Sequence, residues 1–203
     1  SLKESMNPGT FVIVDQFIDR TVYRKKSFFN EGIVAHIPMS EPTSKELMKL
    51  CKKNLDVLNI SNVLGGTYLA MEGPQFSTKA ESNLYKQWGC DVIGMTNMPE
   101  AKLAREAEIR YCSISMVTDY DCWHPKHESV TLEMIIRTMK ENTSKSKEFI
   151  KKISQEYYKG INFSKDKTNN ILDTSIITHH ESWNKEIEKK LNTILKRYKT
   201  VNI

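Results

Sequence analysis

The feature that most constrains the fold is a regular alternation of short apolar runs with helical patterns. Apolar runs typical of buried strands lie at residues 67–71, 91–95 and 110–117. Each gap between them fits one helix, over about residues 77–88 and 100–107, with Gly89 as a stop signal and Pro99 as a start signal. Because parallel strands need such crossover helices, this order predicts an α/β fold whose mostly parallel central sheet is flanked by helices.

The same interpretation extends to both ends of the chain. The apolar run at residues 11–14 predicts a strand buried on both faces, residues 15–20 a polar exit from it, and residues 21–42 a long surface loop. Ser44 and Ser77 are expected to cap the helices that follow them. Further helices are predicted at about residues 130–153 and 181–198, with a polar loop at 157–170. We treat residues 1–203 as a single domain.

Composition excludes several functional classes. The net charge of +5 is scattered among acidic residues, with no basic stripe interleaved with aromatics, so we expect no nucleic-acid partner. No run approaches the roughly 20 apolar residues that a membrane helix needs, and the opening residues show no secretory signal, so we expect a cytoplasmic protein without membrane contact. The 4 cysteines lack CxxC spacing and are expected to be reduced thiols.

Polar and aromatic side chains follow three of the predicted strands. They are Phe76 and Ser77, then Met95 and Thr96, then Thr118, Asp119 and Asp121. In a parallel sheet these three strand ends would open on one edge and could form one pocket. Such a set suits a flat polar heterocycle joined to a sugar, with the ring against Phe76, the sugar against Met95 and ring nitrogens bonded by the carboxylates.

Simpler roles exist for each of these residues, and spacing alone does not decide between them. Phe76 and Met95 could be core side chains, Ser77 a helix cap, and the two aspartates solvated loop residues. The set Cys122, His124 and His127 has poor spacing for zinc, so we expect no metal. Neither of the common phosphate-loop motifs, GxGxxG and GxxxxGK[ST], occurs.

Taken together, several segments resemble the S-methyl-5′-thioadenosine phosphorylases, which belong to the trimeric purine nucleoside phosphorylase family. The segments are residues 15–21, 36–42, 72–77, 80–82, 94–96, 99–101 and 118–123. The resemblance covers about residues 1–153 in order, and the tail matches loosely around residues 170–178.

The resemblance implies a nucleoside-phosphorylase-like fold, a homotrimer and a pentosyltransferase activity in methionine and purine salvage. The reaction is cleavage of methylthioadenosine by phosphate, a co-substrate, to adenine and 5-methylthioribose 1-phosphate, with no organic cofactor or metal. Two alternatives remain open. One is phosphorolysis of another purine nucleoside or of methylthioinosine, and the other is a non-catalytic nucleoside-binding or assembly module.

The resemblance also implies a role for each candidate residue. Asp119 and Asp121 would be catalytic, binding adenine at N7 and its amino group, and Asp119 would donate to N7 if protonated. The other expected contacts are Phe76, Ser77, Met95 and Thr118 with the nucleoside, Thr96 with phosphate, and His36 with the 5′-substituent in a neighbouring subunit.

Two comparisons with the family pattern refine this expectation. Related enzymes for 6-oxopurines carry Asn where Asp119 stands and Glu where Ser77 stands, so both positions favour a 6-aminopurine. Family subunits also begin with a stretch that holds a Gly-rich phosphate loop, an Arg-His motif and another phosphate-contacting threonine, none of which occurs in this sequence. We therefore expect this chain to supply Thr96 to the phosphate site, with Ser77 as the second candidate, and an assay of the chain by itself tests its activity.

Overall fold

Strand β1, Phe11–Val14, lies at the centre of the fold and is completely buried. The computed structural model describes residues 1–29, 32–125 and 132–202 of the chain. Phe11 and Ile13 face a core shared with Leu55 and Phe149, whereas Val12 and Val14 face a second core that includes Tyr68. This alternation of faces is the period of two that a strand imposes, and it confirms the prediction of a strand buried on both sides.

Two strand pairs carry the fold from one sheet into another. Strand β1 runs parallel to β3, Asn62–Leu64, and β2, Gln16–Arg20, runs parallel to β4, Thr67–Met71. The segment from β1 to β2 and the segment from β3 to β4 bend at the same level, where the Gly66 N–H donates to Asp15 Oδ1 at 2.8 Å. Gly65 and Gly66 have φ of 90° and 148°, which favours glycine at this bend. The interpretation of residues 16–20 as a strand exit was wrong, because this partly exposed polar segment forms a sheet strand.

The remaining two strands join different sheets. Strand β5, Val92–Gly94, runs parallel to β4, so the second sheet has the order β2-β4-β5. Strand β6, Ser113–Met116, pairs antiparallel with β1, so the first sheet has the order β3-β1-β6. Three of the four pairings between the described strands are parallel, which confirms the α/β class. The expectation that β4, β5 and β6 lie in one parallel sheet was wrong.

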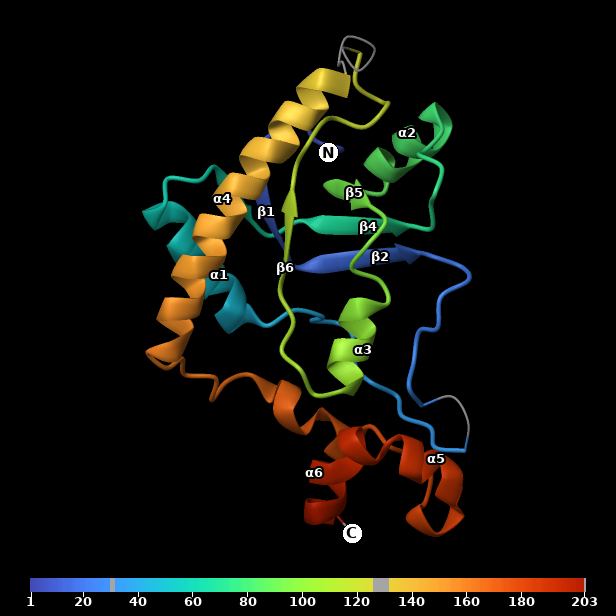
Figure 1. Cartoon of the computed structure of the whole chain (residues 1–203). Coiled ribbons are helices and arrows are strands. Elements are labelled where there is room, and N and C mark those ends of the chain that lie inside the picture. Colours follow the sequence, from blue (N-terminus) through green and yellow to red (C-terminus); the bar gives the residue numbers. More distant parts are fainter. Residues whose placement is uncertain (30–31, 126–131, 203) are drawn as a thin grey trace.

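Four helices surround the strands. They are α1, Lys45–Val57; α2, Lys79–Gln87; α3, Glu100–Glu106; and α4, Leu132–Tyr158. In Figure 1, α1 and α4 lie on one side of the strands and α2 and α3 on the other. Ser44 caps α1 as predicted, but α2 is capped by Thr78, which forms a reciprocal capping box with Glu81. The predicted cap at Ser77 was therefore wrong by one residue.

Helix α4 extends five residues beyond its predicted end, so part of the expected 157–170 loop is helical. Its predicted apolar face is packed only in part. Phe149 is buried against β1 and α1, whereas Met139 and Ile150 are 51% and 59% exposed. Within the described residues no helix is long and apolar enough to cross a membrane.

The C-terminal segment is a series of short helices. They are η2, Lys167–Thr174; η3, His180–Ser182; α5, Lys185–Lys190; and α6, Asn192–Asn202. The predicted single helix at 181–198 was wrong, because the chain breaks between α5 and α6 at the buried Leu191. Arg197 of α6 donates to Glu108 and to Asp173, at 2.5 and 2.6 Å, and so attaches this segment to the chain that follows α3.

Candidate active site

Strand β6 and its exit form one wall of a cavity of about 490 Å³. The Val117 backbone holds the strand end in place: its N–H donates to Thr10 O at 2.9 Å, and its carbonyl accepts from Asn142 Nδ2 of α4 at 3.0 Å. The chain then turns so that Asp119 and Asp121 both line the cavity. Two carboxylates are thus presented at the carboxyl end of a strand, as the sequence predicted.

The opposite walls come from β4, β5 and the loops that follow them. Six predicted site residues line this one cavity: Phe76, Met95, Thr96, Thr118, Asp119 and Asp121. The structure therefore brings these six together even though β6 belongs to the other sheet and runs antiparallel to β1. The bend between the two sheets places the end of β6 opposite the ends of β4 and β5. The three strand ends therefore meet across two sheets and not along the edge of one.

The position of Met95 depends on a glycine in the opposite loop. Gly73 has φ of 74°, and a Cβ there would lie 2.6 Å from Met95 Sδ. Any larger residue would collide with the thioether and would adopt this backbone conformation only with strain. Gly73 thus allows the loop that carries Phe76 to pack directly against Met95. The Phe76 ring itself is 85% exposed at the cavity mouth, where it is free to stack on a flat ligand.

The hydroxyl of Thr96 is positioned by a buried tyrosine. Tyr68 Oη accepts a hydrogen bond from Thr96 N and lies 3.3 Å from Thr96 Oγ1. A Cβ at Gly94 would lie 2.1 Å from Tyr68 Oη, so only glycine fits beside this phenol. Tyr68 lines the cavity but was not predicted as a site residue, because a tyrosine in a buried strand has the pattern of a core residue.

Asn97 is a second site residue that sequence reasoning missed. Its Oδ1 accepts from Tyr111 Oη at 3.0 Å and from Ser113 Oγ at 2.9 Å, which ties the exit of β5 to the start of β6. Its φ of 70° lies in the left-handed region that Asn tolerates better than most residues. An Asn directly after a strand exit and close to a proline is the available sequence signal for such a turn.

The two aspartates differ in their hydrogen bonding. Asp119 Oδ1 accepts from the Thr118 hydroxyl, whereas Asp121 Oδ2 is buried and has no hydrogen-bond partner among the described residues. The backbone of the loop is fixed by Ser1, whose carbonyl accepts from Asp121 N and from Trp123 Nε1 at 2.9 Å each. A buried acceptor without a donor is costly in the free protein, and it fits a ligand that brings an N–H group.

Two predicted residues lie outside this cavity. Ser77 lies beside it, with its hydroxyl 3.8 Å from Met71 Sδ and its carbonyl accepting from Cys122 Sγ. His36 lines a different cavity of about 330 Å³ together with Lys26 and Lys102, and its backbone N–H donates to Ser175 O at 2.8 Å. The predicted contact of His36 with a neighbouring subunit stays a prediction.

Metal-binding groups do not gather in the part of the chain that the structure describes. No cluster of three or more His, Cys, Asp or Glu side chains there could hold a metal ion. His124 instead stacks on Tyr120, with ring centroids 4.3 Å apart, and contacts Glu4 Oε1. The third member of the set considered from the sequence, His127, lies outside the described residues.

Comparisons with known proteins point to one family. The model of the phosphorylase superfamily matches residues 1–155. S-methyl-5′-thioadenosine phosphorylase of Rhodospirillum rubrum is 52% identical over 197 residues, which cover 97% of this chain and 67% of that protein. A methylthioadenosine phosphorylase from an antarctic soil metagenomic library has a similar structure, with a TM-score of 0.86, 37% identity, and coverage of 96% of this chain and 68% of that one.

A second solved structure is similar and has a ligand. Methylthioadenosine phosphorylase from Schistosoma mansoni in complex with adenine gives a TM-score of 0.79 at 28% identity, over 87% of this chain and 69% of that one. The chain thus spans about two thirds of the length of each of these three relatives.

Proposed function

This chain belongs to the phosphorylase superfamily, and on that premise we propose that it acts in the phosphorolysis of S-methyl-5′-thioadenosine. The products are adenine and 5-methylthioribose 1-phosphate, in the salvage of methionine and purines. The small-molecule partners are the nucleoside and phosphate, and the reaction uses no organic cofactor and no metal. The single observation that carries the proposal is the gathering of Phe76, Met95, Thr96, Asp119 and Asp121 around one cavity.

Each wall of the cavity suits one part of this nucleoside. The adenine ring stacks on the exposed face of Phe76, and the ribose packs on the thioether of Met95. Asp121 Oδ2, buried and without a donor among the described residues, accepts from the 6-amino group of adenine. The Thr96 hydroxyl, held next to Tyr68 Oη, contacts phosphate from the other side of the sugar.

The chemistry follows from the charges that develop during bond cleavage. As the bond between C1′ and N9 breaks, its electron pair moves to the purine and positive charge develops on the sugar. An oxygen of phosphate then bonds to C1′. Asp119 in its protonated form, placed at N7, lowers the barrier by donating its proton to N7 of the leaving purine. A carboxylate at Asp121 favours adenine over hypoxanthine, because it accepts from an amino group and repels a carbonyl oxygen.

Two further parts of the proposal are the oligomeric state of the protein and its cellular compartment. We place the protein in the cytoplasm as a homotrimer, in which His36 reaches the 5′-substituent of a nucleoside bound to the next subunit. The position of His36 supports this, since it lies in the 21–42 segment and away from the Asp119 cavity of its own chain. Cross-linking and analytical ultracentrifugation test the trimer, and a monomer at working concentration would exclude the role of His36.

The deciding experiment separates the candidate activities. The chain is incubated with phosphate and, in parallel, with methylthioadenosine, adenosine, inosine or methylthioinosine, and the released base is identified by chromatography. Release of adenine from methylthioadenosine above all other substrates is the expected result. Release of hypoxanthine would instead favour a 6-oxopurine phosphorylase. Calorimetric binding of adenine without turnover would favour a non-catalytic nucleoside-binding module.

A further inference from the structure

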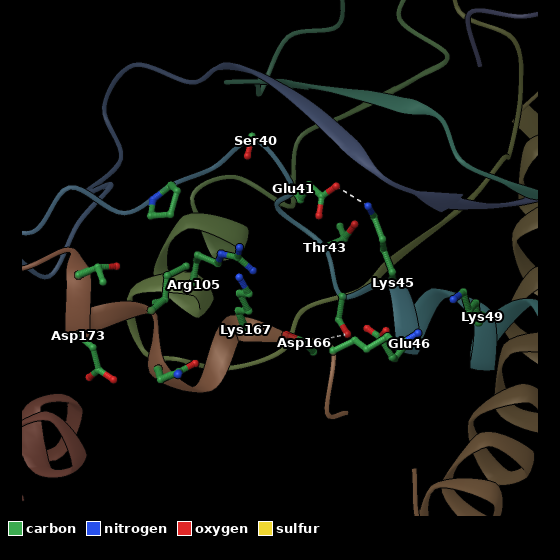
Figure 2. Close-up of a pocket in the computed structure, with 16 residues that line it drawn as sticks. Ser40, Glu41, Thr43, Lys45, Glu46, Lys49, Arg105, Asp166, Lys167 and Asp173 are labelled. Carbon is green, nitrogen blue, oxygen red and sulfur yellow. Dashed lines mark hydrogen bonds and ion pairs between the residues drawn. The ribbon is translucent and has the colours of Figure 1, made fainter. Parts of the chain in front are cut away.

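A second and larger cavity, of about 930 Å³, lies between the segment 38–46, α3 and η2 (Figure 2). None of the described residues that line it also lines the cavity around Asp119. Its volume lies within the range of small-molecule sites. Its lining is strongly charged, with five basic and four acidic side chains. The proposed reaction uses none of these groups.

Three of the four carboxylates in this lining already have basic partners. Glu41 forms an ion pair with Lys45, which Figure 2 marks with a dashed line. Asp166 is bound by the Ser44 hydroxyl and lies 3.5 Å from Arg110 Nε, and Asp173 accepts from Arg197 at 2.6 Å. Arg110 and Arg197 lie outside the cavity lining, so they neutralise its acids without using its cations.

The basic side chains of the lining are, in contrast, short of counterions. Within the described part of the chain, Lys49, Lys165 and Lys167 form no ion pair, and Glu46 is the one lining carboxylate without a partner in an ion pair. The cavity therefore has an excess of positive charge. In Figure 2 the ends of the Arg105 and Lys167 side chains point toward one another.

Arg105 carries the most specific signal. Its Nη1 donates to Thr168 Oγ1 at 3.0 Å, but its Nε is buried and has no partner among the described residues. Burial lowers the pKa of this guanidinium, and the nearby Asp166 and Glu41 oppose that effect without bonding to it. A buried N–H without an acceptor is costly, and an anion with several oxygens would satisfy it.

We propose that this cavity binds a phosphoryl group, either free phosphate or the phosphate of a small organic molecule. Arg105 donates hydrogen bonds to the phosphoryl oxygens through Nε and the adjacent guanidinium nitrogen, and Lys167 supplies the second positive charge. A planar guanidinium matches a phosphoryl group with two parallel hydrogen bonds, whereas lysine acts as a point charge. Lys49 and Lys165, which are exposed, attract the anion toward the cavity. The proposal does not depend on the reaction proposed above.

Calorimetric titration of the full chain tests the site, with inorganic phosphate, pyrophosphate and ribose 5-phosphate as separate probes at low ionic strength. We expect binding that is weakened about tenfold or more in Arg105→Gln and in Lys167→Gln, and less in Arg105→Lys. Lys151→Gln, an exposed lysine on α4, is the matched control and should leave binding unchanged. Thr96→Val removes the phosphate contact of the other cavity and should also leave this binding in place.

Several outcomes would overturn the proposal. They are no binding of any probe to the wild-type chain, equal binding to Lys167→Gln and wild type, or loss of binding in Thr96→Val. Lys167 is exposed, so its variant stays informative even if Arg105→Gln fails to fold. Tight binding of inorganic phosphate identifies the free anion as the ligand, whereas a preference for ribose 5-phosphate identifies a phosphorylated small molecule.

Discussion

Replacing Asp121 with alanine should raise the stability of the free protein while weakening adenine binding. Asp121 Oδ2 is buried without a hydrogen-bond donor among the described residues, a condition that costs about 1–3 kcal/mol. Asp121→Ala removes this cost, while the backbone hydrogen bond from residue 121 to Ser1 O remains possible. The variant should therefore be as stable as the wild type or more stable, by up to that amount.

The effect on binding should have the opposite sign. A hydrogen bond from the adenine amino group to a buried carboxylate contributes about 1.5–3 kcal/mol, so its loss should raise the Kd for adenine by about tenfold to a hundredfold. Urea denaturation measures the free energy of unfolding, and calorimetry measures the Kd. Asp56→Ala, an exposed aspartate paired with Lys52, serves as control and should not change adenine binding.

Two results would refute this reasoning. If Asp121→Ala unfolds at a clearly lower urea concentration than the wild type, the carboxylate has a stabilising partner in the free protein and is not an unpaired acceptor that awaits a ligand. If adenine binds the variant with wild-type affinity, Asp121 does not accept from the amino group. Opposite changes in stability and affinity are expected of a binding residue and not of a structural one.

Three further predictions address the site and its support. Asp119→Asn should lower adenine release from methylthioadenosine about a hundredfold, a general-acid contribution, and wild-type turnover would contradict the role of Asp119. Gly94→Ala should destabilise the chain by about 1–3 kcal/mol in urea denaturation, because its Cβ would collide with Tyr68 Oη; an unchanged midpoint would show that the phenol can move. Burial opposes ionisation of Asp19, but hydrogen bonds from Lys102 and other donors outweigh it and hold the pKa of Asp19 well below its usual range. The contribution of ionised Asp19 to the free energy of unfolding is present above the unfolded pKa of about 4 and is lost as pH falls from there toward the lower folded pKa. The difference in stability between wild type and Asp19→Asn should therefore shrink on acidification, and a constant difference would contradict this role of Asp19.

Local signals predicted most helices and the central strands, because capping residues and apolar periodicity act over a few residues. The error at Ser77 was avoidable, since Thr78 and Glu81 have the spacing of a capping box. Strand β2 was missed for a physical reason: its polar, partly exposed residues look like a loop, and the sheet edge accepts them. The antiparallel pairing of β6 with β1 depends on contacts about 100 residues apart in sequence, which a local pattern does not encode.

The candidate site was predictable as a set of residue types and not as a geometry. The resemblance to known phosphorylases assigned roles to Asp119 and Asp121, and the structure places both at one cavity. The supports of that cavity were not predictable in the same way. Tyr68 and Asn97 each act through two hydrogen bonds to neighbouring segments, and each has an ordinary structural explanation when only its sequence context is known.

The shared bend at Asp15 and Gly66 bears on the width of the cavity around Asp119. Asp119 and Asp121 follow β6 of the β1 sheet, whereas Phe76 and Thr96 follow β4 and β5 of the second sheet. The segments 11–20 and 62–71 each run through both sheets. We therefore expect the angle between the two sheets to set the distance between these two walls, although the bend itself lies outside the cavity lining. Asp15→Ala removes the hydrogen bond at this bend and should alter nucleoside affinity, as measured by calorimetry, although Asp15 does not line the cavity. An unaltered affinity would mean that packing alone fixes the angle between the sheets.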